Sequence, residues 1–186
     1  DVPLKGLLPL VEAMAKVRTS VPAELVVVGS VRPEGPVAAA IDRYGLRDSV
    51  HFTGRLSEDD LIHELRRAEI AVVPSLFEGF SLPLVEAMAC ATPVIATTAG
   101  ALPEVAGPDG EAALLVPPGD AGALAVAIER LLGDPVLRAR LGSAGRERAS
   151  SRFTWAAAAK ATVDRYRHVV HCNRSGAGQQ AGPAAC

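Results

Sequence analysis

Short apolar runs, separated by amphipathic stretches, organise most of this chain. Near-continuous runs of Val, Leu, Ile and Ala are typical of strands buried on both faces of a parallel sheet. Between the runs, apolar residues recur at helical spacing, and this alternation predicts an α/β fold with a doubly wound parallel sheet. The four clear runs are Leu25–Val28, Ile70–Val73, Val94–Ala96 and Leu114–Val116, and a weaker fifth is Val50–Thr53.

Three helices can be placed from their apolar faces and their ends. Ser57, followed by three acidic residues, predicts a capped helix start with a favourable first turn. A helix beginning near Ser81 and Pro83 is closed by Pro93. The apolar faces are Leu7, Leu10, Val11, Met14 and Val17 in the first helix, Leu61, Leu65 and Ala68 in the second, and Leu84, Met88 and Ala91 in the third.

After Pro117–Gly119 the pattern becomes entirely helical. Leu124, Ile128 and Leu131 mark one helix, Asp134-Pro135 opens the next, and Thr154 caps a last one in which Trp155 and Val170 share a face. Residues 172–186 show no apolar periodicity, so we expect a disordered tail there. The expected organisation is one domain over residues 1–171 and the tail.

Composition narrows the classes of function. A formal charge of −2 gives no reason to expect nucleic acid as a partner. The three cysteines, without CxxC spacing, favour reduced thiols in a cytoplasmic protein, and no apolar run has the length of a membrane span. Abundant Arg, Ala, Gly and Pro suggest a bacterial source. Metal-binding motifs are missing, so we expect no metal and no cofactor.

The segment from Pro74 to Glu104 carries the chemistry. A buried strand ends at Pro74, and the next helix starts near Leu82, at the carboxyl edge of the predicted sheet. The amides and the positive dipole end of a helix N-terminus bind anions, and ligands bind at this edge in doubly wound folds. Glu78 precedes the helix, and Glu86 lies on its outward face. A diphosphate at the helix start would leave Glu86 able to chelate a ribose diol and Glu78 facing hydroxyls on the other side.

These residues resemble a known family. The Glu78-x7-Glu86 pattern in EGFSLPLVE, continued by AMACATPVIATTAGALPEV, resembles the retaining GT-B glycosyltransferases of the large group 1 (GT4-like) family. The resemblance implies a Rossmann-like C-terminal domain that binds a nucleotide-diphospho-sugar. It also implies that Glu78 contacts the hydroxyl groups of the donor sugar and that Glu86 contacts the ribose. The amides that follow Glu78 would cradle the diphosphate, and the residues concerned are Gly79, Phe80, Ser81 and Leu82.

Further family positions lie elsewhere in the chain. Lys5, before Gly6 at the head of the first helix, matches a lysine that neutralises the departing diphosphate; the alternative is a surface lysine. The turn HFTGRLS resembles one near the nucleotide base, so Arg55 or Leu56 would line the base pocket. Apart from the resemblance, Gly29 ends the Leu25–Val28 strand and opens a loop that we expect to approach the donor; the alternative is an ordinary strand-ending glycine. The sequence departs from the family pattern at Ala91 and Ala101, where the family usually has Gly. If either position requires a positive φ, alanine strains the backbone there.

The arginines of the C-terminal helices allow two interpretations. A solvated helical face is favoured over contact with anionic lipid, although peripheral membrane contact of a longer enzyme stays open. The residues are Arg138, Arg140, Arg146, Arg148 and Arg152.

The resulting hypothesis is a retaining glycosyltransferase domain that takes a UDP- or GDP-sugar, with its N-terminal acceptor domain outside this chain. On that hypothesis, the last helix returns towards the other domain and leaves part of its apolar face uncovered. The alternatives are a non-catalytic nucleotide-sugar-binding or regulatory module and a GT-B-like sugar epimerase. The base, the sugar and the acceptor are left open by the sequence.

Overall fold

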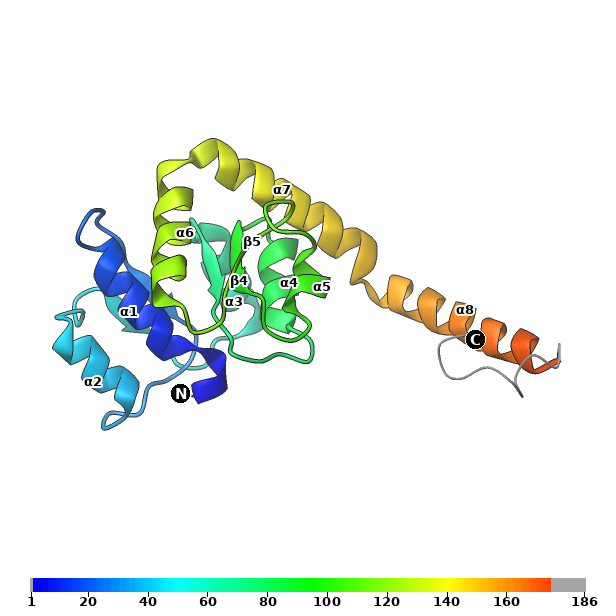
Figure 1. The fold of residues 1–186 in the computed structure, drawn as a ribbon, viewed down its shortest axis with the longest axis horizontal. Helices are drawn as coiled ribbons and strands as arrows, with labels where there is room; N and C mark the ends of the chain where they lie inside the picture. The colour runs from blue at the N-terminus through cyan, green and yellow to red at the C-terminus, as the bar shows by residue number, and fades with distance from the viewer. Residues whose placement is uncertain (1, 175–186) are drawn as a thin grey trace. The chain divides into compact units, whose positions relative to one another are not determined.

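The computed structural model describes residues 2–174. The chain forms two compact units, the first ending at Arg148 and the second beginning at Ala149. Figure 1 shows the elements in chain order. The strands are β1 (Leu25–Val27), β2 (Val50–Phe52), β3 (Ala71–Val73), β4 (Val94–Thr97) and β5 (Leu114–Val116). The helices are the 3-10 turn η1 (Pro3–Lys5), α1 (Leu7–Val17), α2 (Pro36–Arg43), α3 (Glu58–Arg67), α4 (Leu82–Ala89), α5 (Leu102–Ala106), α6 (Ala121–Gly133), α7 (Pro135–Arg152) and α8 (Trp155–Arg174).

Every strand pairing is parallel, as the alternation of strand and helix predicts. β1 pairs with β2, with Leu25 opposite Val50, and β3, β4 and β5 pair in that order. A helix follows each of the first four strands before the next strand begins. The carboxyl ends of parallel strands meet at one edge, so the loops that follow the strands gather there.

Helices cover the β3–β4–β5 sheet on both faces. One core joins the buried residues of α1, α2 and α6 to the strands, with Val11, Ile95 and Leu124 among them. On the other face α4 and α5 pack against β4, and their buried side chains include Leu84, Met88 and Leu102. Figure 1 shows α1 and α6 on one side of β4 and β5, and α4 and α5 on the other.

The strands differ in burial more than the sequence suggests. The expectation that Leu25–Val28 and Ile70–Val73 are fully buried is wrong: all three residues of β1 and two of the three in β3 are only half-buried. Among the described strands, β1 and β2 pair only with each other, so less of their surface is covered. Of the five strands in residues 2–174, only β4 is buried throughout.

The predicted helix caps are present. The Ser57 side chain accepts a hydrogen bond from the amide of Asp60 at the start of α3. Thr154 accepts one from the amide of Ala157 at the start of α8. The predicted apolar face of α3 is less buried than expected, since no residue of that helix is fully buried.

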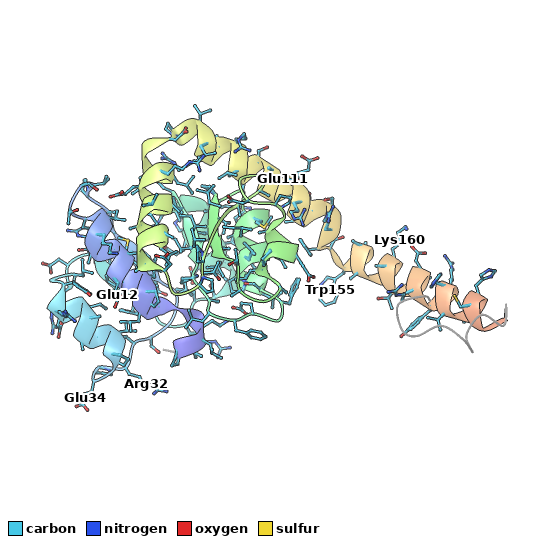
Figure 2. The ribbon with its side chains drawn as sticks, in the orientation of Figure 1. Glu12, Arg32, Glu34, Glu111, Trp155 and Lys160 are labelled. Carbon is cyan, nitrogen blue, oxygen red and sulfur yellow. The ribbon has the colours of Figure 1, made fainter. Side chains whose placement is uncertain are left out.

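The second unit consists largely of α8. Its large apolar side chains are exposed, from Val163 at 44% to Trp155 at 92%; Figure 2 labels Trp155 and Lys160 on this helix. The helix extends to Arg174, three residues into the segment expected to be disordered, and residues 175–186 of that segment lie outside the described part. Within residues 2–174, no helix has both the length and the apolar character that crossing a membrane requires.

The expectation of a solvated arginine face is confirmed for Arg140, Arg146 and Arg152, which are exposed, and is wrong for Arg138 and Arg148, which are half-buried. Arg138 donates to the carbonyls of Leu131 and Leu132 at the end of α6 and pairs with Glu69 at 3.0 Å. Arg140 and Arg148 also donate to backbone carbonyls, of Gly110 and of the Glu104–Val105 turn respectively. The carbonyl acceptors of Arg138 and Arg148 lie in the last turns of α6 and α5, where carbonyls lack intrahelical donors, which explains these contacts.

Candidate functional site

The loop between β3 and α4 holds the predicted carboxylate in contact with the predicted lysine. Lys5 Nζ lies 2.6 Å from Glu78 Oε1, although the two residues are 73 positions apart in sequence. The side chain of Glu78 is 10% exposed, whereas that of Lys5 is 54% exposed. A largely buried carboxylate therefore meets a cation that a ligand can still reach.

The N-terminal segment reaches this loop through its backbone. Pro3–Lys5 forms one 3-10 turn, and Gly6 then takes a left-handed conformation with φ +68° before α1 begins. The amide of Leu76 donates to the carbonyl of Leu4 at 2.7 Å, and a Cβ added to Gly6 would clash with the carbonyl of Pro74. Lys5 is therefore the last residue of η1 and directly precedes Gly6, the N-cap of α1, which agrees with its predicted place at the head of the first helix.

The Glu78 carboxylate is an anion beside Lys5 within the protein itself. This pairing brings together two residues that the resemblance associates with the same donor. The diphosphate expected near Lys5 stays a prediction.

The loop after β4 holds Glu78 from another side. The amide of Ala101 donates to the carbonyl of Glu78 at 2.9 Å. Gly100 has φ +56°, and a Cβ there would clash with that same carbonyl, so glycine is required for the close approach. Ala101 has φ −84° and needs no glycine, whereas Ala91 at the end of α4 has φ +61° and carries the strain anticipated for it.

The start of α4 is built as predicted, with one qualification for Ser81. Its side chain caps the helix by accepting from the amide of Leu84, and Pro83 occupies the first turn. Ser81 is fully buried, while Phe80 is 50% and Leu82 is 63% exposed. Gly79 is exposed as well. A ligand at this helix start would approach Gly79, Phe80 and Leu82 before Ser81.

Glu86 lies on the outward face of α4, where the helical spacing places it. The residue is exposed, in contrast to its buried neighbours Ala87 and Met88. Its carboxylate makes no hydrogen bond or ion pair within residues 2–174. The side chain is therefore available to a ligand on that face.

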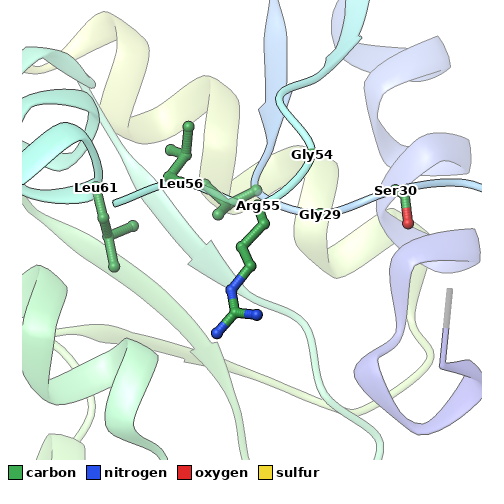
Figure 3. A pocket seen from close by; sticks show the side chains of 7 residues that line it. Gly29, Ser30, Gly54, Arg55, Leu56 and Leu61 are labelled. Atoms are coloured by element: carbon green, nitrogen blue, oxygen red, sulfur yellow. The ribbon is translucent and has the colours of Figure 1, made fainter. Parts of the chain in front are cut away.

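Arg55 and Leu56, of which one or the other was expected near the base, line one hollow of about 360 Å³ together with Gly29, whose loop was expected to approach the donor. Gly29 and Gly54, which follow β1 and β2, bridge through the Gly54 amide and the Gly29 carbonyl at 2.9 Å. Figure 3 shows the Arg55 side chain extended away from the loop that carries it. The lining residues are Val28, Gly29, Ser30, Gly54, Arg55, Leu56 and Leu61.

Sequence reasoning missed two buried hydroxyl groups beside Glu78. Ser75 Oγ donates to Glu78 Oε1 at 2.8 Å, and Thr97 Oγ1 donates to the carbonyl of Ser75 at 2.5 Å. The three-residue interval between Ser75 and Glu78 was a local signal for the first contact. Nothing local pointed to Thr97, which lies on another strand.

These contacts define what the site can do. An exposed ammonium group and the start of a helix favour an anion, and the carboxylate beside them accepts hydrogen bonds from hydroxyl groups. Among the described residues no cluster of His, Cys, Asp and Glu could hold a metal ion, and Cys90 and Cys172 are free thiols.

Sequence comparisons match the chain to a family and to known proteins. A sequence profile of the family described as glycosyl transferases group 1 matches residues 2–148. The chain is 47% identical over 170 residues to an MMP α-(1→4)-mannosyltransferase of Mycolicibacterium hassiacum, covering 91% of this chain and 41% of that protein. It is 36% identical over 163 residues to a GDP-mannose-dependent monoacylated α-(1-6)-phosphatidylinositol monomannoside mannosyltransferase of Corynebacterium glutamicum, covering 83% of this chain and 42% of that protein.

Solved structures share the fold. A sucrose-phosphate synthase from Thermosynechococcus elongatus superposes with a TM-score of 0.79 at 38% identity, covering 92% of this chain and 44% of that one. The C-terminal domain of a group 1 family protein from Francisella tularensis gives 0.73 at 30% identity, with 83% of both chains covered. Anabaena HepE in complex with UDP-glucose gives 0.73 at 28% identity, covering 82% of this chain and 42% of that one.

The fold is thus that of the C-terminal Rossmann-like half of GT-B glycosyltransferases, and the chain spans about two fifths of the length of the curated relatives described above. The profile match covers most of its residues, and the mannosyltransferase match covers nearly all of them. The chain therefore belongs to the group 1 family of glycosyl transferases.

Proposed function

We propose that this chain is the donor-binding half of a retaining glycosyltransferase and that it binds a UDP- or GDP-sugar. The observation that carries the proposal is the contact between Lys5 and Glu78 beside the start of α4. It combines a cation, a helix N-terminus and a buried carboxylate at the carboxyl edge of a parallel sheet. A diphosphate joined to a sugar has matching chemistry, with anionic oxygens next to hydroxyl groups.

Each predicted residue has a role in the proposed complex. The Lys5 ammonium group and the amides at the start of α4 stabilise the charge that develops on the departing diphosphate, without a metal ion. Glu78 accepts hydrogen bonds from the sugar hydroxyls and orients the ring. The diphosphate leaves from the same face on which the acceptor adds, which retains the configuration of the sugar.

In the proposed complex, the nucleoside of the donor contacts Glu86 and the hollow near Arg55. Glu86, exposed and unpaired in the described chain, accepts hydrogen bonds from the ribose diol. The base enters the hollow lined by Gly29, Arg55 and Leu56. These apolar and backbone surfaces suit a planar ring, and Arg55 adds donors for its carbonyl oxygens.

The descriptions of similar proteins support both guanine and uracil as the base of the proposed donor. The Corynebacterium relative is described as GDP-mannose-dependent, and Anabaena HepE binds UDP-glucose. The acceptor side of the reaction would come from a further domain, since the relatives are more than twice the length that this chain covers.

Calorimetric titration of the purified chain tests the proposal. UDP, GDP, UDP-glucose and GDP-mannose are titrated in turn, with adenosine as a control that lacks the diphosphate. We expect weak binding of at least one pair of nucleotide and nucleotide sugar, and no sugar transfer by the chain alone. Absence of binding by all four diphosphates would contradict the donor site, and efficient transfer by the chain alone would contradict its being half of an enzyme.

A further inference from the structure

The Ser75 hydroxyl group lies beneath the proposed site. Ser75 is 2% exposed, and its Oγ donates to Glu78 Oε1 at 2.8 Å. Lys5 Nζ contacts the same oxygen at 2.6 Å. The Glu78 carboxylate therefore has one donor from the protein interior and one from the surface.

The interior donor is anchored to the sheet. Thr97 ends β4, the strand that is buried throughout, and its hydroxyl group donates to the carbonyl of Ser75. Both Ser75 and Thr97 are inaccessible to a ligand, at 2% and 0% exposed. Two successive hydrogen bonds, from Thr97 to Ser75 and from Ser75 to Glu78, thus fix the Glu78 carboxylate, which lies on a loop, relative to β4.

The two donors to Glu78 differ in what else they can do. Lys5 is long and more than half exposed, so its ammonium group can turn towards an arriving diphosphate. Ser75 is short and buried, so it can act on a donor sugar only through Glu78. When Lys5 serves the diphosphate, Ser75 still fixes the carboxylate.

We propose that Ser75 is a positioning residue that keeps the Glu78 carboxylate aimed at the donor sugar while Lys5 turns to the diphosphate. This inference rests on the proposed function, because it assumes that Glu78 faces the sugar. It goes beyond that function by assigning a role to a buried hydroxyl group that touches neither the sugar nor the diphosphate.

The test compares the sugar with the nucleotide that carries it. Ser75→Ala and Ser75→Cys are titrated with UDP and UDP-glucose and with GDP and GDP-mannose. Cysteine has nearly the size of serine but is a weak donor, so it separates the hydrogen bond from the space it fills. We expect both variants to lose about fivefold in affinity for the nucleotide sugar, the effect of one net hydrogen bond, and to change less than twofold for the free diphosphate.

A Glu78→Ala background isolates the coupling between the two residues. There Ser75→Ala should have no further effect on sugar affinity, because the group that it positions is gone. Equal losses for nucleotide and nucleotide sugar would overturn the proposal, as would a Cys variant that behaves like wild type or a full Ser75→Ala effect in the Glu78→Ala background.

Hydrogen exchange provides a readout without any ligand. We expect the amides of residues 76–80 to exchange faster in Ser75→Ala than in wild type, since the carboxylate no longer ties the loop to β4. Unchanged exchange would also overturn the proposal. If wild type binds none of the four ligands, the proposed function fails, and the exchange rates still decide whether Ser75 holds Glu78.

Discussion

Two loop regions of the first unit are built in opposite ways. Around Glu78, hydrogen bonds from Thr97 and Ala101 connect β4 and the loop after it to the loop after β3. Within that loop Ser75 donates to Glu78, and the carboxylate is nearly buried. Around Arg55, the loops after β1 and β2 enclose an open hollow. The Arg55 guanidinium group is exposed and has no hydrogen bond or ion pair within the described residues.

The difference corresponds to the two tasks of a donor site. A group that acts on charge and orientation during a reaction is effective when its position is fixed in advance. A base needs only a complementary surface, so the hollow can stay open until the ligand arrives. We therefore expect the region around Glu78 to tolerate change poorly, and the hollow to tolerate it well.

Gly100→Ala should have the largest effect, and Gly54→Ala is its matched control. Both glycines have positive φ, but only at Gly100 would a Cβ clash with the carbonyl of Glu78; at Gly54 it would meet nothing within 4 Å. Urea unfolding should show a loss of about 1 kcal/mol for Gly54→Ala, from backbone strain, and about 2–4 kcal/mol for Gly100→Ala. If both variants lose the same free energy of unfolding, the close approach of Gly100 to the Glu78 carbonyl does not contribute to stability.

Glu86→Ala should weaken nucleotide binding without changing stability. Loss of a hydrogen bond to a charged group is worth about 1.5–3 kcal/mol, or roughly 10- to 150-fold in affinity measured by calorimetry. The control is Glu111→Ala, which removes an exposed acid that Figure 2 labels outside the proposed site. If Glu86→Ala binds UDP and GDP as tightly as the control does, Glu86 does not hold the ribose.

Arg55→Ala should have the smallest effect of the three. Its guanidinium group is exposed, so we expect about a fivefold loss in affinity for UDP or GDP, close to the value of one ordinary hydrogen bond. Arg47 provides the control, because its guanidinium group is already paired with Asp42 at 2.6 Å. A loss of more than a hundredfold in affinity would show that the hollow tolerates substitution as poorly as the region around Glu78.

Features that depend on local spacing could be predicted from the sequence. The strands, the caps at Ser57 and Thr154 and the outward face of Glu86 follow from local spacing, and the structure has them. The family resemblance pointed to Arg55 and Leu56, which line one hollow, whereas Gly29 was singled out only because it ends a strand; contact of this hollow with a base stays a prediction.

Contacts between distant segments were harder to predict. A serine in a loop is ordinarily interpreted as a turn residue, and the Thr97 hydroxyl group that holds Ser75 comes from 22 residues later in the chain. The same applies to Arg148, whose carbonyl partners lie more than 40 residues away. Local charge patterning gives no information about such partners, so those arginines appeared solvated.

The contact between Lys5 and Glu78 supports the central claim, and one titration tests it most directly. Lys5→Ala removes the cation and leaves the Glu78 carboxylate facing the incoming diphosphate. Lys16→Ala removes the other lysine of the first unit, which is exposed on α1. Calorimetry with UDP and GDP, repeated at several salt concentrations, measures both the affinity and its dependence on charge.

We predict that Lys5→Ala lowers the affinity for UDP and GDP by at least about tenfold, as expected when a charge-assisted hydrogen bond is lost. The remaining binding should depend less on salt, and Lys16→Ala should match wild type. If Lys5→Ala binds both nucleotides with the affinity and salt dependence of wild type, Lys5 does not serve the diphosphate, and the proposed donor site is contradicted.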